Sequence, residues 1–213
     1  MIRITRRGFS ERTLLRVGMI LCAAAFFVHP LHAGPNNPPA RLGLSLAAGA
    51  FRANQAAFRD LYGNVKASWN IGAQACLFGN AAVIAGFRSI RTSGATMIAA
   101  PPYGNEHHPL QFGMSSLKLG GRLSFPLRRW AVFVDGGGSY NLSHEKWEDT
   151  DLSVEAKTFG YFAGAGADVS LDRRLSFFTR IEYSFVDTGK GARLEPRVNL
   201  GGIEASLGFS LRF

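Results

Sequence analysis

The C-terminal end of the chain alternates strictly between two kinds of side chain. The apolar positions are Ile203, Ala205, Leu207, Phe209, Leu211 and Phe213, and the intervening positions are Glu204, Ser206, Gly208, Ser210 and Arg212. A period of two places these sets on opposite faces of a β-strand. A strand of this kind, ending on an aromatic residue, is typical of a barrel whose outer surface contacts lipid.

The first 33 residues predict a cleaved secretory signal peptide. Five arginines precede an apolar run from Val17 to Val28, and Leu31-His32-Ala33 offers a cleavage site. This run is too short for a bilayer core of about 30 Å, which a helix crosses with roughly 20 residues. We expect cleavage after Ala33, with a short segment over 34–40 before a barrel over 41–213.

The leader also contains Thr5-Arg6-Arg7-Gly8-Phe9, which is similar to the twin-arginine signal that exports folded proteins. A membrane barrel has to travel unfolded, because folding in the cytoplasm would expose its apolar belt. We therefore interpret these arginines as ordinary leader charge. Cys22 follows Leu21 rather than a small residue, so no lipid anchor is expected.

The charge balance argues against a nucleic-acid-binding protein. The full chain has 24 Lys and Arg against 15 Asp and Glu. The first 33 residues hold five basic and one acidic residue, so 19 basic and 14 acidic residues remain after cleavage, a net charge of +5. This excess is modest, and no basic run is interleaved with aromatic residues. Cys76 is then the single cysteine left, so no intrachain disulfide is expected.

Eight segments alternate over lengths close to the 9 to 11 residues typical of membrane strands. They are residues 41–52, 64–77, 81–91, 113–125, 130–140, 158–171, 175–186 and 198–213. Short connections near Gly79, Arg128 and Arg173 alternate with long ones, of which residues 92–112 form the longest. This asymmetry predicts an all-β fold, an eight-stranded antiparallel up-and-down transmembrane β-barrel with short turns facing the periplasm.

These features resemble the small outer-membrane β-barrel proteins of the OmpA/OmpX type, in the porin-like barrel-domain family. The resemblance rests on the leader, Leu61-Tyr62-Gly63 opening the second strand, Asn199-Leu200-Gly201-Gly202 at the start of the eighth, and the C-terminus. Phe209, Leu211 and Phe213 are similar to the signal that the barrel-assembly machinery reads. The resemblance implies insertion into a Gram-negative outer membrane by that machinery, with periplasmic chaperones, and contact with lipid and lipopolysaccharide. Since the chain ends at Phe213, we expect no peptidoglycan-binding domain.

The inner faces of these strands carry ten charged residues. They are Lys66, Arg88, Lys118, Arg122, Asp135, Asp168, Arg180, Glu182, Glu204 and Arg212. Side chains nearly fill an eight-stranded barrel, and charges held away from bulk water need partners. A structural charge network in a closed barrel is therefore the favoured interpretation. The excess of two cations and the interior glycines leave a narrow, anion-preferring pore as the alternative.

The aromatic residues at strand ends predict interfacial girdles. Trp130, Tyr140, Tyr183 and Phe213 have the large or amphipathic rings that such girdles use. Trp69 lies in the middle of a strand and is assigned to lipid contact.

One adjacent set of residues has the groups of a hydrolase. Ser143, His144 and Glu145 offer a nucleophile, a base and an acid, as lipid A deacylation by serine-hydrolase chemistry would need. In an extended segment, however, His144 points away from both neighbours, and the set falls in an expected external loop. We predict no catalytic site and no enzyme activity.

No metal or cofactor site is predicted either. His107 and His108 lie beside Glu106, but no third ligand has suitable spacing. The acidic residues between Glu145 and Glu155 lack the pattern of a calcium loop, although such carboxylates are able to hold divalent cations that bridge lipopolysaccharide.

The expected role is structural or one of surface interaction, because loops on a rigid scaffold commonly carry binding. Residues 92–112 are the expected contact for an extracellular ligand. A small-solute pore is the second hypothesis, which conductance distinguishes. A lipid A-modifying enzyme is the third, which altered lipid A acylation distinguishes.

Overall fold

The computed structural model describes residues 42–100, 104–127, 130–149, 152–172, 174–186 and 199–213. The side chains of residues 96–100 and 104–107 are not part of this description. The predicted signal peptide over 1–33, the segment over 34–40, and the arginines at 128, 129 and 173 lie outside the described residues.

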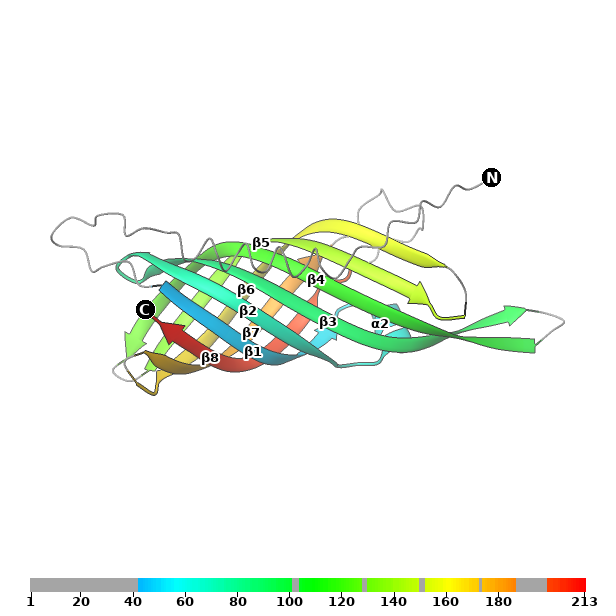
Figure 1. The fold of residues 1–213 in the computed structure, drawn as a ribbon, viewed down its shortest axis with the longest axis horizontal. Helices are drawn as coiled ribbons and strands as arrows, with labels where there is room; N and C mark the ends of the chain where they lie inside the picture. The colour runs from blue at the N-terminus through cyan, green and yellow to red at the C-terminus, as the bar shows by residue number, and fades with distance from the viewer. Residues whose placement is uncertain (1–41, 101–103, 128–129, 150–151, 173, 187–198) are drawn as a thin grey trace. The chain divides into compact units, whose positions relative to one another are not determined.

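Eight antiparallel strands close into a barrel, which confirms the predicted fold class (Figure 1). They are β1 (Leu42–Ala53), β2 (Lys66–Phe78), β3 (Ala81–Ala100), β4 (Gly104–Leu127), β5 (Trp130–Trp147), β6 (Ser153–Ser170), β7 (Leu175–Val186) and β8 (Gly202–Arg212). Each strand pairs with the next, and β8 closes the barrel on β1, with Phe209 opposite Leu46. No helix in the described ranges is long and apolar enough to cross a membrane.

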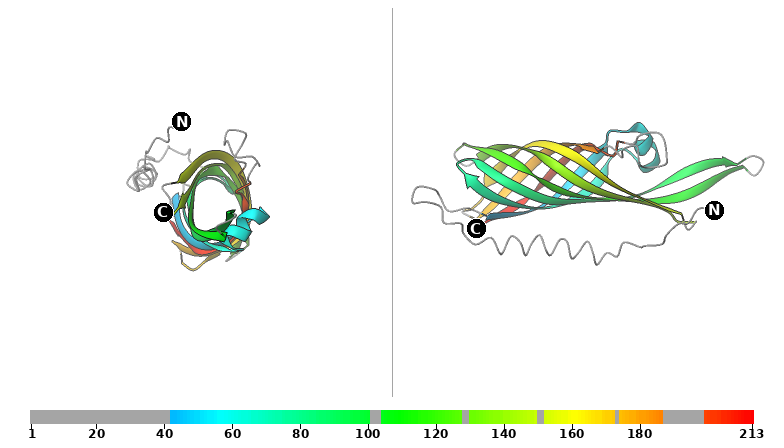
Figure 2. Two further views of the ribbon diagram at one scale, coloured as in Figure 1. Left: turned by 90° about the vertical axis from the view of Figure 1, so that its right-hand side faces the viewer. Right: turned by 90° about the horizontal axis from the view of Figure 1, so that it is seen from above.

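The two ends of the barrel differ in their connections. At the short-turn end, β2 and β3 join through Gly79 and Asn80, and β8 ends at Arg212. Gly79 has a φ of 52°, a left-handed conformation that residues with a side chain rarely adopt. At the opposite end, which we call the hairpin end, β3 and β4 project far beyond the other strands (Figures 1 and 2).

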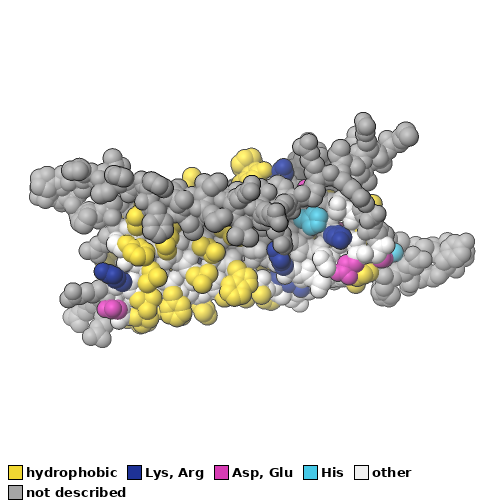
Figure 3. Space-filling model, in the orientation of Figure 1, with side chains coloured by type: hydrophobic (Ala, Val, Ile, Leu, Met, Phe, Trp, Pro, Cys, Tyr) yellow, Lys and Arg dark blue, Asp and Glu magenta, His cyan; other side chains and the backbone are white. Residues whose placement is uncertain are grey.

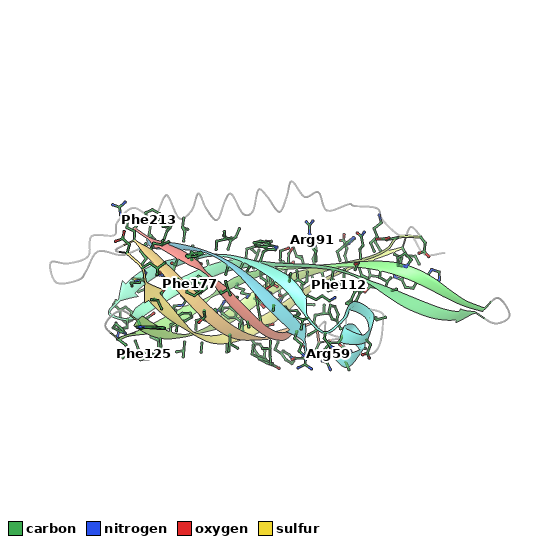
Figure 4. The ribbon with its side chains drawn as sticks, turned by 90° about the horizontal axis from the view of Figure 1, so that it is seen from below. Arg59, Arg91, Phe112, Phe125, Phe177 and Phe213 are labelled. Carbon is green, nitrogen blue, oxygen red and sulfur yellow. The ribbon has the colours of Figure 1, made fainter. Side chains whose placement is uncertain are left out.

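The alternating patterns give the barrel an apolar outer surface. Large exposed side chains on it include Leu46, Trp69, Ile71, Leu119, Leu123, Val134, Phe159, Tyr161, Ile181, Ile203, Leu207 and Phe209. Figure 3 shows apolar side chains over the left and middle of the visible face, with charged side chains and histidine beyond them toward the hairpin end. Phe125, Phe177 and Phe213 lie toward the short-turn end (Figure 4). This distribution suits a lipid-facing belt with aromatic residues near its edge.

The predicted loop over residues 92–112 is wrong. Strand β3 continues to Ala100 and β4 begins at Gly104, in unbroken register from Arg91 opposite Gly113 to Ala100 opposite Gly104. Pro109 is tolerated because its carbonyl accepts a bond from the backbone of Glu148 on the β5 side. Its missing N–H faces the same side, so the ladder between β3 and β4 loses no bond.

The connection between β5 and β6 is also shorter than predicted. Strand β5 extends to Trp147 and β6 begins at Ser153, with Glu145 opposite Val154. Ser143, His144 and Glu145 therefore lie in a strand and not in a loop, and much of the expected acidic loop is paired. Polar composition favours loops, but a continuous backbone ladder overrides that preference.

The connection between β1 and β2 contains a helix that the sequence pattern did not predict. Helix α2 (Ala56–Tyr62) ends where Gly63, with a φ of 86°, donates its backbone N–H to the carbonyl of Arg59. Leu61-Tyr62-Gly63 thus ends a helix and does not open β2. The glycine ends the helix because it enters this conformation without steric cost.

Candidate functional site

The barrel interior near the hairpin end is filled by an apolar cap. We define this apolar cap as the buried cluster of Phe51, Ala53, Phe58, Tyr62, Ile90, Leu110, Phe112, Met114, Val186 and Leu200. Its residues come from β1, β3, β4 and β7, from the segment before β8 and from α2, so elements distant in sequence meet there. These side chains pack against one another as a close-packed core does, and they place apolar groups across the lumen.

Helix α2 supplies the aromatic centre of the apolar cap. The ring of Phe58 lies 4.8 Å from that of Tyr62 and 4.9 Å from that of Phe112, in tilted and edge-to-face geometry. Arg59 holds the helix to the end of β1 by donating to the carbonyl oxygens of Ala53 and Asn54, at 2.9 and 2.5 Å. Figure 4 shows Arg59 and Phe112 on this side of the barrel.

Gly94 of β3 allows α2 to approach the strand closely. A Cβ at this position would lie 2.4 Å from the carbonyl oxygen of Leu61 and 2.8 Å from the ring of Tyr62. No side chain fits at such distances, so the glycine fixes how tightly the helix closes the cap.

Tyr62 also places a polar group in the apolar cap. Burial, and then the nearby carboxylate of Glu145, raise the pKa of its hydroxyl far above the ordinary value. The hydroxyl makes no hydrogen bond of ordinary geometry within the described residues. It is therefore a neutral group at physiological pH, and the cap stays uncharged.

A charge network lies inside the barrel, next to the apolar cap. We define the charge network as Arg88, Lys118, Arg122, Asp135, Arg180, Glu182 and Glu204. Glu182 is its hub, with Arg88 at 3.4 Å, Lys118 at 2.5 Å and Arg180 at 2.7 Å. Side chains from β3, β4 and β7 thus meet at one carboxylate, which ties separate parts of the barrel wall together.

The other two carboxylates of the charge network have equally specific partners. Asp135 accepts from Arg122 and Arg180, each at 2.7 Å. Glu204 pairs with Arg88 at 3.3 Å and accepts from Ser68 and Asn70 at 2.5 and 2.6 Å. Such satisfied pairing is what buried charges require.

Aromatic rings separate and shield the cations. The guanidinium of Arg122 lies 3.9 Å from the ring centre of Phe133, and that of Arg88 lies 5.1 Å from Phe51 of the apolar cap. Cation–π contacts of this kind partly replace the water that a buried cation loses.

Three of the ten predicted network residues lie outside this group. Arg212 pairs with Asp168 at 2.9 Å near the short-turn end, where Ser176 also donates to the carboxylate at 3.2 Å. Lys66 begins β2 at the hairpin end and makes no ion pair with any described residue. The structure therefore brings seven of the ten residues together in the charge network and pairs Arg212 with Asp168 outside it. Lys66 lies apart from both groups.

A cavity of about 70 Å³ opens on the short-turn side of the charge network. Its wall includes Gln74, Gly86, Lys118, Arg122, Asp168 and Arg180. A space of this size holds several ordered waters. The interior thus has an apolar cap, a charge network and a polar cavity in sequence along the barrel axis.

The hydrolase candidates do not form a catalytic arrangement. Ser143 and Glu145 are on one face of β5 and His144 on the other, where His144 pairs with Glu155 at 3.6 Å. His108 contacts the carboxylate of Asp149 and lies against the ring of Trp147. Among the side chains that the structure describes, no group of three His, Cys, Asp or Glu is placed to hold a metal ion.

Fold and interior together define a transmembrane β-barrel with a filled lumen. A sequence model of the outer membrane protein beta-barrel domain matches residues 19–213. The chain belongs to this family, and it is an outer-membrane protein. No characterised protein sequence matches it significantly.

Solved structures share the fold at low sequence identity. Neisserial surface protein A is 11% identical, with a TM-score of 0.55, over 81% of this chain and 95% of that one. Ail, the attachment invasion locus protein of Yersinia pestis, in complex with the heparin analogue sucrose octasulfate, is 14% identical, with a TM-score of 0.53, over 82% and 99%. A major outer membrane protein of Thermus thermophilus is 15% identical, with a TM-score of 0.50, over 81% and 99%.

Proposed function

We propose that this protein is a closed outer-membrane barrel that presents its β3–β4 hairpin for contact with molecules outside the cell. The single observation that carries the proposal is the projection of these two strands beyond every other strand (Figure 2). The hairpin end faces the exterior, because short turns face the periplasm in barrels of this kind.

The filled interior supports a role at the surface. The apolar cap and the charge network lie in series across the lumen, and a hydrated solute has to break both to cross. We therefore place the narrow pore second. We also infer that the protein is not an enzyme, because the hydroxyl, imidazole and carboxylate groups on β5 face opposite sides.

The projecting hairpin has backbone groups that no described strand pairs. The β2–β3 ladder ends at Ser68 opposite Ile90, and the β4–β5 ladder ends at Leu110 opposite Trp147. Beyond these pairs, β3 and β4 bond to each other alone among the described strands. Free strand edges recruit extended segments of other proteins, with main-chain hydrogen bonds supplying affinity.

The names of two similar structures support a role at the cell surface. Neisserial surface protein A is a surface protein, and Ail was solved with a heparin analogue. By the same resemblance, we expect lipopolysaccharide around the barrel and insertion by the barrel-assembly machinery. Phe209, Leu211 and Phe213, which that machinery would read, are exposed on the outer face.

A proline at a free edge tests the proposal. The backbone carbonyl of Pro109 points toward the β5 side. Ala95 lies opposite Pro109, so the N–H and C=O of Ala95 point away from β4, and those of Met97, two residues further along β3, point the same way. Met97→Pro removes a backbone N–H from the free edge without breaking the β3–β4 ladder. Met97→Ala keeps that N–H and is the control.

The measurement is adhesion of cells carrying each variant to heparin-coated and to protein-coated surfaces. We expect Met97→Ala to adhere like the parent and Met97→Pro to lose at least tenfold, at equal surface amounts of folded barrel. Equal adhesion of all three, or adhesion no greater than that of cells lacking the protein, would contradict the proposal.

A further inference from the structure

The cavity on the short-turn side of the charge network is lined by three cations and, among its described lining residues, by one carboxylate, that of Asp168. Lys118, Arg122 and Arg180 line the cavity, whereas their carboxylate partners Asp135 and Glu182 are not among its described lining residues. The side chains of those two carboxylates are 0 and 2% exposed. A solute inside the cavity therefore meets a cationic surface, although most charges are paired.

The cations differ in exposure, and Arg212, near the short-turn end, is the most exposed of them. The side-chain values are 1% for Arg88, 6% for Lys118, 13% for Arg180, 18% for Arg122 and 33% for Arg212. Water and small solutes thus reach the cavity from the periplasm, while the apolar cap closes the other side.

Among the described residues, the interior charges leave one positive charge for an anion to balance. Between the apolar cap and the short-turn end, five cations (Arg88, Lys118, Arg122, Arg180 and Arg212) face four carboxylates (Asp135, Asp168, Glu182 and Glu204), an excess of one positive charge. In addition, the buried Nε–H of Arg180 donates to no described group. Planar guanidinium groups match oxyanions well, because they donate two parallel hydrogen bonds.

We infer that this cavity binds a small oxyanion from the periplasm, either tetrahedral like phosphate or a short carboxylate. The anion sits among Lys118, Arg122 and Arg180, and Asp168, which also lines the cavity, is paired with Arg212. The binding site is closed at its inner end, because the apolar cap lies beyond it. It is independent of any contact that the β3–β4 hairpin makes.

Two substitutions should weaken anion binding in different ways, one through charge and one through volume. The Gln74 side-chain oxygen accepts from Arg122 at 3.3 Å, so Gln74→Glu adds a carboxylate in the cavity and still bonds the same guanidinium. Gly86→Leu leaves every charge in place: a Cβ there makes ordinary contacts at 3.6 and 3.9 Å, and the rest of the side chain fills the cavity. Gln111→Glu on the exposed part of β4 is the control for net charge.

Calorimetric titration of sodium phosphate and of sodium acetate into the folded protein, at constant ionic strength, measures binding directly. We expect saturable 1:1 binding of at least one of these anions, at least tenfold weaker in Gln74→Glu and in Gly86→Leu. Binding to Gln111→Glu should stay within twofold of the parent. A gel shift on boiling confirms that each variant is folded.

Comparison of the two anions narrows the class: preference for phosphate indicates a tetrahedral oxyanion, and preference for acetate a carboxylate. The inference is overturned if neither anion gives saturable binding to the folded parent. It is equally overturned if both cavity variants that fold bind as tightly as the control.

Discussion

Individual residues in the lumen are under stronger constraint than those on the outer face. Glu182 accepts hydrogen bonds from Arg88 and Lys118 and forms an ion pair with Arg180, and all of these groups are buried or nearly so. Outer residues such as Leu119 or Ile181 need only be apolar, because they face lipid. A single lumen substitution therefore disturbs several strands at once.

Replacement of the hub tests this constraint. Glu182→Gln removes the negative charge and leaves Arg88, Lys118 and Arg180 facing one another, and breaking a buried ion pair costs about 3–5 kcal/mol. We expect the free energy of unfolding, measured by urea titration in lipid vesicles, to fall by that amount.

Glu155→Gln is the matched control. Glu155 is exposed, and its one ion pair with a described residue is with the exposed His144, so a loss within ~0.5 kcal/mol is expected. A cost below ~1 kcal/mol for Glu182→Gln would mean that the charge network contributes little to barrel stability.

Among the elements, the strand faces and most strand ends followed from the sequence, but the ends of β3, β4, β5 and β6 nearest the hairpin end did not. Alternation in β8 identified the outer positions Leu207 and Phe209 because lipid and lumen are different solvents on the two sides of one wall. The ends of β3 and β4 were missed since their outer parts, including Pro109, have the composition of a loop. Helix α2 is seven residues long and is held by tertiary contacts of Phe58 and Tyr62, which leave no local signal.

The site was predictable to a similar degree. Its charged residues could be assigned to the lumen from period two alone. Their pairing could not, because Glu182 meets Arg88 across the lumen through the curvature of the closed barrel, which no sequence pattern specifies.

Strand β8 allows a direct test of the face assignment. Leu207 is exposed on the outer face, whereas its neighbour Ser206 lines the polar cavity. Leu207→Arg places a charge in lipid at a cost of up to about 2–4 kcal/mol, and Ser206→Arg places it in a polar space. We expect a marked loss of assembled protein for Leu207→Arg, with a much smaller loss for Ser206→Arg, in quantified outer-membrane fractions. Equal yields would show that the faces are assigned wrongly.

At the scale of the whole molecule, the barrel is asymmetric along its axis. The hairpin end holds the apolar cap and the projecting β3 and β4, and the cavity lined by Lys118, Arg122 and Arg180 lies on the short-turn side of the charge network. Two opposite surfaces are therefore available for binding, separated by a seal. We propose that a membrane protein of this design contacts molecules on both sides of the outer membrane without passing solutes between them.

Single-channel recording in a planar bilayer is the most direct test of this central claim. The refolded protein is used only where its gel mobility shifts on boiling, as a folded barrel requires. We predict no steady conductance in potassium chloride, because the apolar cap and the charge network close the lumen in series. A steady, anion-preferring conductance would contradict the closed barrel and identify the protein as a pore.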